Sequence, residues 1–378
     1  MDTFRRSLYL ALTIASALFC VAAIPLSADP LLKSAYESFD TGDRQNIKAQ
    51  IQSGPRSVAI GDLNGDGRPD LVVAAPGSNA LWDSAAVVSV HLASPYPPTT
   101  QPPFLPATNF ATDVGTAAVA LADMNHDGRL DVVTANSSAS TVSVLLGDGT
   151  GKFGVHVDAT TGTYPQYVAA ADLNADGNPD VVTINSGSRT ISVIFGLGNG
   201  GLGMRQDYAT GPGPTSILIA QLNGDSAPDI VVTCGTDSTF ISIYLNNGSG
   251  GFAARTDVAT PAAPLSVAAG LMNGDGAVDL VVGMDVPTPV SVFLGTGTGA
   301  FPTQTDYPAP GAGLAVALSD VNNDGHLDAV VSLFGGSDGE QDIGVFMGDG
   351  TGALGPAALY DAGPTVLGLA CADLDGDG

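Results

Sequence analysis

Positive charge is scarce in this sequence. Its 378 residues include 12 Lys and Arg against 38 Asp and Glu, and charged residues make up only 13% of the chain. No lysine follows Lys152 and no arginine follows Arg255. Binding to nucleic acid or to anionic lipid depends on clusters of Lys and Arg, so the composition argues against both. A formal net charge of −26 suits a chain that binds cations.

Cysteine is also rare, with three residues in the chain. Cys20 lies in the apolar segment near the N-terminus, which is expected to be removed as a signal peptide. Cys234 and Cys371 then remain. Two cysteines do not make a disulfide framework. Both lie in or beside apolar runs, which favours buried thiols, although a bridge between them stays open.

Long apolar runs are absent except at the N-terminus. Arg5 and Arg6 precede an apolar stretch of 16 residues from Leu8 to Ala23. This pattern predicts a signal peptide over 1–23, with cleavage after Ala23 or as late as Ala28, followed by a linker over 24–44. The stretch is short for a membrane span, and a retained anchor or a buried helix are the alternatives. The sequence therefore predicts a secreted or cell-surface protein with no membrane span beyond this segment.

Glycine and proline are abundant, with 49 and 25 residues. They alternate with short Val, Ile and Leu runs, a pattern typical of many short strands joined by tight turns. One short motif recurs through the chain. Its copies are DLNGDGRPD from Asp62, DMNHDGRLD from Asp123, DLNADGNPD from Asp172, QLNGDSAPD from Gln221, LMNGDGAVD from Leu271, DVNNDGHLD from Asp320 and DLDGDG from Asp373. The starts are 61, 49, 49, 50, 49 and 53 residues apart, so the chain is built from repeats of about 50 residues.

Each repeat predicts four strands. An apolar run precedes the motif, a second follows it, an alternating run such as Thr190–Ile194 comes next, and a Gly-rich turn leads to a polar fourth strand. Four strands per repeat is typical of a propeller blade. We therefore expect an all-β fold, a seven-bladed β-propeller of four-stranded blades over residues 45–378, with the last blade truncated. The repeats start near 57, 118, 167, 216, 266, 315 and 368, and 45–50 resembles the outer strand that would complete blade seven.

The motif reads Asp-x-Asn-x-Asp-Gly-x-x-Asp, with oxygen side chains at positions 1, 3, 5 and 9. The glycine at position 6 permits a sharp turn, which brings these oxygens together, and position 7 adds its carbonyl oxygen. Hard oxygen ligands with three carboxylates suit Ca²⁺. Asn, Asp and Gly also favour ordinary turns, but repulsion between three carboxylates would destabilise a turn without a cation.

The motifs predict four or five structural Ca²⁺ sites. The predicted ligands are Asp62, Asn64, Asp66, Arg68, Asp70, Asp123, Asn125, Asp127, Arg129, Asp131, Asp172, Asn174, Asp176, Asn178, Asp180, Asp320, Asn322, Asp324, His326, Asp328, Asp373, Asp375 and Asp377. Arg68, Arg129, Asn178 and His326 stand at position 7 and contribute only their carbonyl oxygens. The loop at Gln221 lacks the first carboxylate and has Ser226 in place of glycine, and the loop at Leu271 lacks the first carboxylate, so neither is predicted to bind calcium well.

The repeated Asp motif and the Gly-rich turn that ends in a bulky apolar residue resemble the FG-GAP/VCBS repeat family, best known from the propeller of integrin α subunits. The resemblance covers about residues 45–378. It implies a seven-bladed propeller with calcium loops on one face and a role in extracellular adhesion or ligand binding. It does not identify the ligand.

The sequence favours a binding or adhesion module with an extracellular protein or carbohydrate ligand, and not an enzyme. The four histidines form no catalytic group by their spacing, and they are His91, His126, His156 and His326. A structural scaffold of a larger surface protein and a polysaccharide-active lyase or hydrolase are the alternatives.

Overall fold

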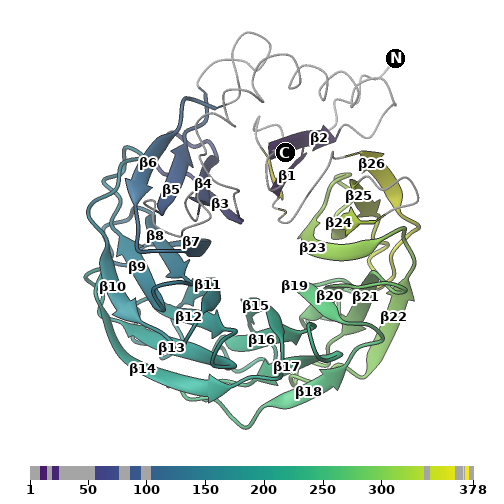
Figure 1. Cartoon of the computed structure of the whole chain (residues 1–378). Helices are drawn as coiled ribbons and strands as arrows, with labels where there is room; N and C mark the ends of the chain where they lie inside the picture. Colours follow the sequence, from purple (N-terminus) through teal and green to yellow (C-terminus); the bar gives the residue numbers. More distant parts are fainter. Residues whose placement is uncertain are drawn as a thin grey trace.

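A computed structural model of the chain describes residues 9–14, 19–24, 56–75, 86–94, 104–335, 341–361, 369 and 371–373. Six four-stranded antiparallel sheets stand around a common axis as the blades of a β-propeller (Figure 1). Within each blade the strands follow one another in chain order from the axis outward. The described residues contain no helix, and so none that could cross a bilayer.

The strands of the first three blades are as follows. Blade 1 contains β3 (Ser57–Gly61), β4 (Asp70–Ala75), β5 (Val87–His91) and β6 (Thr108–Ala111), blade 2 contains β7 (Thr116–Ala122), β8 (Asp131–Asn136), β9 (Thr141–Leu145) and β10 (Val157–Thr160), and blade 3 contains β11 (Pro165–Ala171), β12 (Asp180–Asn185), β13 (Thr190–Gly196) and β14 (Leu202–Ala209).

The other three blades repeat this order. Blade 4 contains β15 (Pro214–Ala220), β16 (Asp229–Cys234), β17 (Phe240–Tyr244) and β18 (Thr256–Ala259), blade 5 contains β19 (Pro264–Gly270), β20 (Asp279–Met284), β21 (Val290–Leu294) and β22 (Thr303–Tyr307), and blade 6 contains β23 (Ala312–Ser319), β24 (Asp328–Phe334), β25 (Gln341–Phe346) and β26 (Ala358–Asp361).

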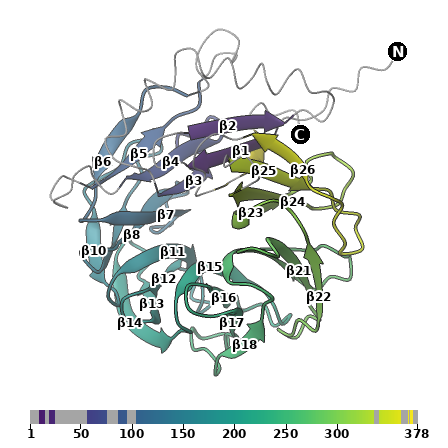
Figure 2. The same ribbon diagram turned by 45° about the vertical axis from the view of Figure 1, so that its right-hand side comes forward.

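The prediction of seven four-stranded blades is wrong, because six sheets have four strands. Among the described residues, the seventh repeat supplies one strand, β27 (Cys371–Asp373), which cannot form a four-stranded blade by itself. It pairs with β1 (Tyr9–Ile14), which also pairs with β2 (Phe19–Ile24), and the resulting sheet has three strands (Figure 2). Each motif marks the start of a blade, so the number of motifs is not the number of complete blades. The segment 45–50, predicted to be an outer strand, lies outside the described residues, and the segment predicted to be a signal peptide contributes β1 and most of β2.

The apolar core lies between neighbouring blades. The second strand of each blade is buried along its whole length, because both of its faces are covered. The one exception is Phe334, the exposed last residue of β24 in blade 6. Burial of apolar side chains between blades stabilises the ring. The residue that closes each Gly-rich turn takes part, as Phe153 of blade 2 shows by meeting Phe110 of blade 1 edge to face with ring centroids 5.3 Å apart. Cys234 and Cys371 are both free thiols, so they form no bridge.

Candidate metal loops

Each of the first six Asp motifs forms the loop between the first and second strands of its blade. The loops are numbered 1 to 6 after their blades, and all six lie at the same end of the propeller, because every inner strand runs in the same direction along the axis. The Gly-rich turns between the third and fourth strands reach the same end. We call this end the Asp-loop face.

The side chain at position 1 organises the loop. In loop 1, Oδ1 of Asp62 accepts hydrogen bonds from the backbone N–H of Gly65 at 2.7 Å and Asp66 at 3.2 Å, and Oδ2 accepts from Gly67 at 2.8 Å. Desolvation acts to raise the pKa of Asp62, but these donors outweigh it and the pKa is lowered. The first carboxylate therefore stays ionised and faces into the turn.

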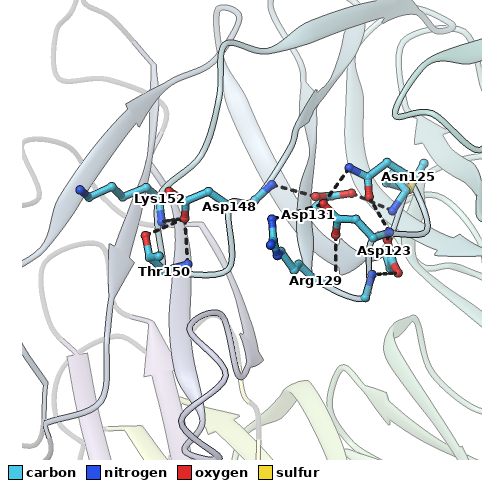
Figure 3. Close-up of polar contacts among 11 residues, drawn as sticks. Asp123, Asn125, Arg129, Asp131, Asp148, Thr150 and Lys152 are labelled. Atoms are coloured by element: carbon cyan, nitrogen blue, oxygen red, sulfur yellow. Dashed lines mark hydrogen bonds and ion pairs between the residues drawn. The ribbon is translucent and has the colours of Figure 1, made fainter.

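Positions 3 and 5 continue the same pattern. In loop 2, Asn125 Oδ1 accepts from the N–H of Asp127 at 3.1 Å, and Asp127 Oδ1 accepts from the N–H of Arg129 at 3.0 Å (Figure 3). Loops 3 and 6 show the same bonds at Asn174, Asp176, Asn322 and Asp324. The predicted oxygens of positions 1, 3 and 5 are thus gathered around one turn in all four complete loops.

Position 9 has a structural task that the sequence did not predict. Asp131 Oδ2 accepts from the N–H of Met124 at 2.8 Å, and its Oδ1 accepts from the N–H of Gly147 at 2.8 Å in the Gly-rich turn (Figure 3). Asp70, Asp180 and Asp328 make the equivalent pair of bonds, and so do Asp229 and Asp279 of loops 4 and 5. In blades 2 to 6 this carboxylate joins the Asp loop to the Gly-rich turn of its own blade, and in blade 1 it joins the Asp loop to Ala93, which follows β5.

The electrostatics of position 9 show that the carboxylates lie close together. The pKa of Asp180 is raised to about 6, mainly by burial and also by the negative charges of Asp176 and Asp172, against two backbone hydrogen bonds that lower it. Burial likewise raises the pKa of Asp70 to about 6, with Asp66 and Asp62 contributing. A cation between the carboxylates would remove this repulsion.

One loop holds a carboxylate oxygen with no partner. Oδ1 of Asp172, at position 1 of loop 3, is buried and accepts no hydrogen bond. An unsatisfied buried acceptor costs free energy, whereas a bound cation would satisfy it. Among the described residues, no group of three or more His, Cys, Asp or Glu side chains could hold a metal by itself. A site here would therefore also need the amide oxygen of position 3 and the carbonyl oxygen of position 7, both of which Ca²⁺ accepts as ligands.

The side chains at position 7 lie outside the turn. Arg129 approaches Asp127 Oδ2 with its guanidinium at 3.8 Å, as an exposed ion pair. Asn178 Oδ1 lies 2.8 Å from Nε2 of His126 in the neighbouring loop. Arg68 donates to the carbonyl oxygen of Ser94 at 3.4 Å. Such contacts leave the position 7 carbonyl as the atom that could serve as a ligand.

The loops with altered motifs differ as their sequences suggest. In loop 4, Gln221 Oε1 accepts from the N–H of Asn223 at 3.1 Å and Gly224 at 3.0 Å, in place of the missing carboxylate. In loop 5, Leu271 is 52% exposed and offers no oxygen. Of the seventh motif, only Asp373 lies in a strand, while Asp375 and Asp377 fall outside the described residues.

Neighbouring blades are also joined through the Asp loops. The N–H of Gly151 donates to the carbonyl oxygen of Leu63, at position 2 of the preceding loop, at 3.2 Å. The corresponding bonds at the next four blade boundaries are Gly200 to Met124 at 3.0 Å, the Asn246 side chain to Leu173 at 2.7 Å, Gly299 to Leu222 at 2.9 Å and Gly352 to Met272 at 2.9 Å. We call these five bonds the belt.

The comparison with protein families follows this repeat. The FG-GAP-like repeat matches residues 123–183, 172–232, 221–282 and 272–331, and the FG-GAP repeat matches residues 54–91. The chain belongs to the FG-GAP repeat family. The four FG-GAP-like matches in this FG-GAP propeller run from the Asp loop of one blade to the second strand of the next, and the FG-GAP match ends at the third strand of blade 1. The first three of these four matches each contain two complete Asp loops, and the fourth begins at Met272, the second position of loop 5, and contains loop 6 complete.

Solved structures share the propeller fold. An Agrocybe aegerita lectin that recognises non-reducing terminal N-acetylglucosamine is 19% identical with a TM-score of 0.61, over 98% of this chain and 96% of the lectin. The periplasmic gluconolactonase of Pseudomonas aeruginosa is 15% identical with a TM-score of 0.63, over 97% and 100%. A Lactobacillus plantarum protein is 13% identical with a TM-score of 0.64, over 97% and 99%. At these identities the likeness concerns the fold alone. No curated protein matches the chain.

The FG-GAP propeller also contains a repeated pair of a buried serine and an exposed aspartate that the sequence analysis missed. A serine in the third strand donates to an aspartate in the fourth, always 15 residues later. The pairs are Ser143–Asp158, Ser192–Asp207, Ser242–Asp257 and Ser291–Asp306. The constant spacing was a signal in the sequence that could have revealed them. They support the blades and lie apart from the Asp loops.

Proposed function

We propose that this FG-GAP propeller is a secreted or cell-surface binding module whose blades are stabilised by Ca²⁺ at loops 1, 2, 3 and 6. The observation that carries the metal proposal is the buried, unpartnered Oδ1 of Asp172 in a turn that also gathers Asp176 and Asp180. Each of the four loops carries the same set of oxygen atoms. The metal acts on folding and not on chemistry, because its ligands connect strands of the scaffold.

A binding role suits the titratable residues better than catalysis. His91 is buried in β5, and burial lowers its pKa to about 4. His126 pairs with Asn178, and Nδ1 of His156 lies 2.8 Å from Asp158. None of these groups is a histidine aligned with a nucleophile, and we infer that the chain is not an enzyme.

Calcium could contribute a large part of the stability. Extracellular calcium modules reach dissociation constants of about 10⁻⁴ M, so about 1 mM calcium stabilises each site by about 1.4 kcal/mol. Four such sites contribute about 6 kcal/mol, comparable with the stability of a typical domain. Thermal unfolding of the full chain in about 2 mM CaCl₂ should therefore give a Tm about 10 °C above that in EGTA.

Two controls make this measurement specific. MgCl₂ at the same concentration should give a much smaller shift, because Mg²⁺ demands tighter octahedral geometry. A variant with Asp62, Asp123, Asp172 and Asp320 all changed to Asn should have the same Tm in calcium and in EGTA. Equal Tm values for the wild type in the two conditions would show that the Asp loops are turns without a metal.

A further inference from the structure

The end of the propeller opposite the Asp-loop face carries two kinds of loop. One joins the second strand of a blade to the third, and the other leads from the fourth strand into the inner strand of the next blade. The residue just before the inner strand is Gly115 in blade 2, Gly213 in blade 4 and Gly311 in blade 6, with φ of +83°, +58° and +85°. In these three blades the residue has a left-handed backbone, which glycine adopts most easily, whereas Ala263 before β19 of blade 5 does not have a positive φ.

Blade 3 places a tyrosine at this position. Tyr164 precedes β11 and has a φ of +60°. A bulky side chain in the left-handed region is a genuine outlier, and such residues concentrate at functional sites. The conformation is imposed on a side chain that resists it, so the fold of blade 3 must hold it there.

The facing loop has changed to make room for this side chain. A Cβ added to Gly115 would lie 2.7 Å from the backbone nitrogen of Ser138, so blade 2 accepts only glycine there. The corresponding facing residue in blade 3 is Gly187, where an added Cβ would lie 3.1 Å from the Cβ of Tyr164. Blade 2 has its glycine in the loop before the inner strand, whereas blade 3 has its glycine in the facing loop between the second and third strands. The missing side chain in that facing loop leaves room for Tyr164.

Hydrogen bonds from two blades fix the backbone of Tyr164. Its N–H donates to Oγ of Ser140 of blade 2 at 3.4 Å, and its carbonyl oxygen accepts from the N–H of Ser186 at 3.1 Å and from its Oγ at 3.2 Å. Gly187 N–H donates to the carbonyl oxygen of Thr163 at 3.1 Å. A side chain positioned in this way loses little conformational entropy when it binds a ligand.

The surroundings of the ring indicate the chemistry of a ligand. Tyr164 is 38% exposed. Thr163 and Ser188 are also exposed, and the N–H of Thr163 donates to Oγ of Ser188 at 3.2 Å. Tyrosine, serine and glycine together form adaptable binding surfaces, in which the ring supplies a flat apolar face and the hydroxyls supply hydrogen bonds. A sugar ring has the complementary features, since it presents apolar C–H faces and a rim of hydroxyls.

We propose that Tyr164, with Thr163 and Ser188, forms a site for a neutral saccharide at the boundary of blades 2 and 3. The ring of Tyr164 stacks on the sugar, and the neighbouring hydroxyls hydrogen-bond to its hydroxyl groups. Protein interfaces centre on a desolvated apolar core, which this hydroxyl-rich surface lacks, so a saccharide fits it better than a protein partner. This assignment rests on the proposed binding function and identifies its ligand class.

Affinity electrophoresis of the full chain in native gels with calcium tests the proposal, since the net charge of −26 ensures migration. The probes are laminarin, mannan, hydroxyethyl cellulose and glycol chitin. At least one should retard the wild type. Tyr164→Gly and Tyr164→Asn should weaken that retardation about tenfold or more, a loss typical of removing an aromatic anchor. Tyr164→Gly should keep or raise the Tm, because glycine relieves the left-handed strain.

The matched control is Leu197→Ala, which removes an exposed side chain of blade 3 at the Asp-loop face and should change neither retardation nor Tm. If both Tyr164 variants are retarded like the wild type, the site is not at Tyr164, although a binding function stands. If no polysaccharide retards the wild type, the ligand class is wrong. Neither result affects the calcium dependence of unfolding, which tests the metal proposal separately.

Discussion

The side-chain amide nitrogen of Gln221 donates a hydrogen bond to the carbonyl oxygen of Ala227 at 3.1 Å. Ala227 stands at position 7 of loop 4, so this carbonyl corresponds to the one proposed as a calcium ligand in the complete loops. The same nitrogen lies 3.3 Å from Oδ1 of Asp225 at position 5. The amide therefore connects oxygens that a cation would bridge in a complete loop.

This relationship predicts that calcium binding can be introduced into loop 4. Gln221→Asp combined with Ser226→Gly restores the complete motif, and the double variant should bind one more calcium per chain than the wild type, as counted by native mass spectrometry. Gln221→Ala is the control, because it removes the amide without adding a carboxylate. It should bind no additional calcium and should unfold at a lower Tm in EGTA. An unchanged calcium count in the double variant would contradict the role assigned to position 1.

Loop 5 needs a single substitution. Leu271 is 52% exposed, so Leu271→Asp removes little buried apolar surface and completes the motif with Asn273, Asp275 and Asp279. The variant should gain one calcium and a higher Tm in calcium, by about 2–4 °C. Its Tm in EGTA should be equal to or slightly below that of the wild type. Leu271→Asn is the matched control, and its Tm in calcium should rise less than that of Leu271→Asp because asparagine adds no charge.

Positions 1 and 9 should respond differently to mutation. Asp131→Ala leaves the N–H groups of Met124 and Gly147 without an acceptor and should lower the free energy of unfolding by about 2–4 kcal/mol even in EGTA. Asp123→Asn should lower the stability mainly in the presence of calcium. It weakens calcium binding, but the amide oxygen still accepts a hydrogen bond within the loop. Denaturant unfolding in calcium and in EGTA separates the two effects. Equal losses for the two variants in EGTA would contradict this division.

Calcium affinity should fall as the pH drops through 6. Burial raises the pKa of both Asp70 and Asp180 to about 6, so below this pH calcium must displace a proton at loops 1 and 3. Isothermal titration calorimetry at pH of about 5, 6 and 7 should show weaker binding and more proton release at the lower values. An affinity that is constant over this range would mean that these carboxylates take no part in binding.

In the metal-free protein, these two carboxyl groups should make the folding stability fall as the pH rises, whereas the calcium affinity rises with pH. Their folded pKa lies above the ordinary value of 3.8, so the folded chain binds these protons more tightly than the unfolded chain. The resulting stabilisation is full below a pH of about 4 and is lost as the pH rises through about 6. Burial lowers the pKa of His91 from 6.5 to about 4, which acts in the other direction over the same range. Comparing Asp70→Asn and Asp180→Asn with the wild type in EGTA isolates the carboxylate contribution.

The sequence predicted the local structure of each blade well because the relevant signals are local. The motif from Asp172 to Asp180 contains both the turn and the start of the next strand, and the apolar runs on either side determine which strands are buried. The number of blades depends instead on which distant strands complete a sheet. The pairing of β1 with β27 joins residues more than 350 positions apart, and no local pattern specifies it.

The dual role of position 9 and the feature at Tyr164 could not be found in the same way. Asp131 reads as a ligand in the motif, and only its contact with Gly147 shows that it also joins two turns. Tyr164 becomes notable when its backbone conformation is compared with that of Gly115 and when Gly187 is seen to face it. Such comparisons need dihedral angles and contacts between loops, which a single sequence does not display.

The belt has a mechanical consequence. Apolar attraction between blades is non-directional, whereas a hydrogen bond such as that from Gly200 to Met124 is directional and adds resistance to small sliding movements. Each hydrogen bond of the belt also ends on an Asp loop, and the position 9 carboxylate of that loop accepts a hydrogen bond from the turn between the third and fourth strands of the same blade. A load applied to one blade is therefore passed to the next at the five boundaries from blade 1 to blade 6, and these six blades should resist shear together.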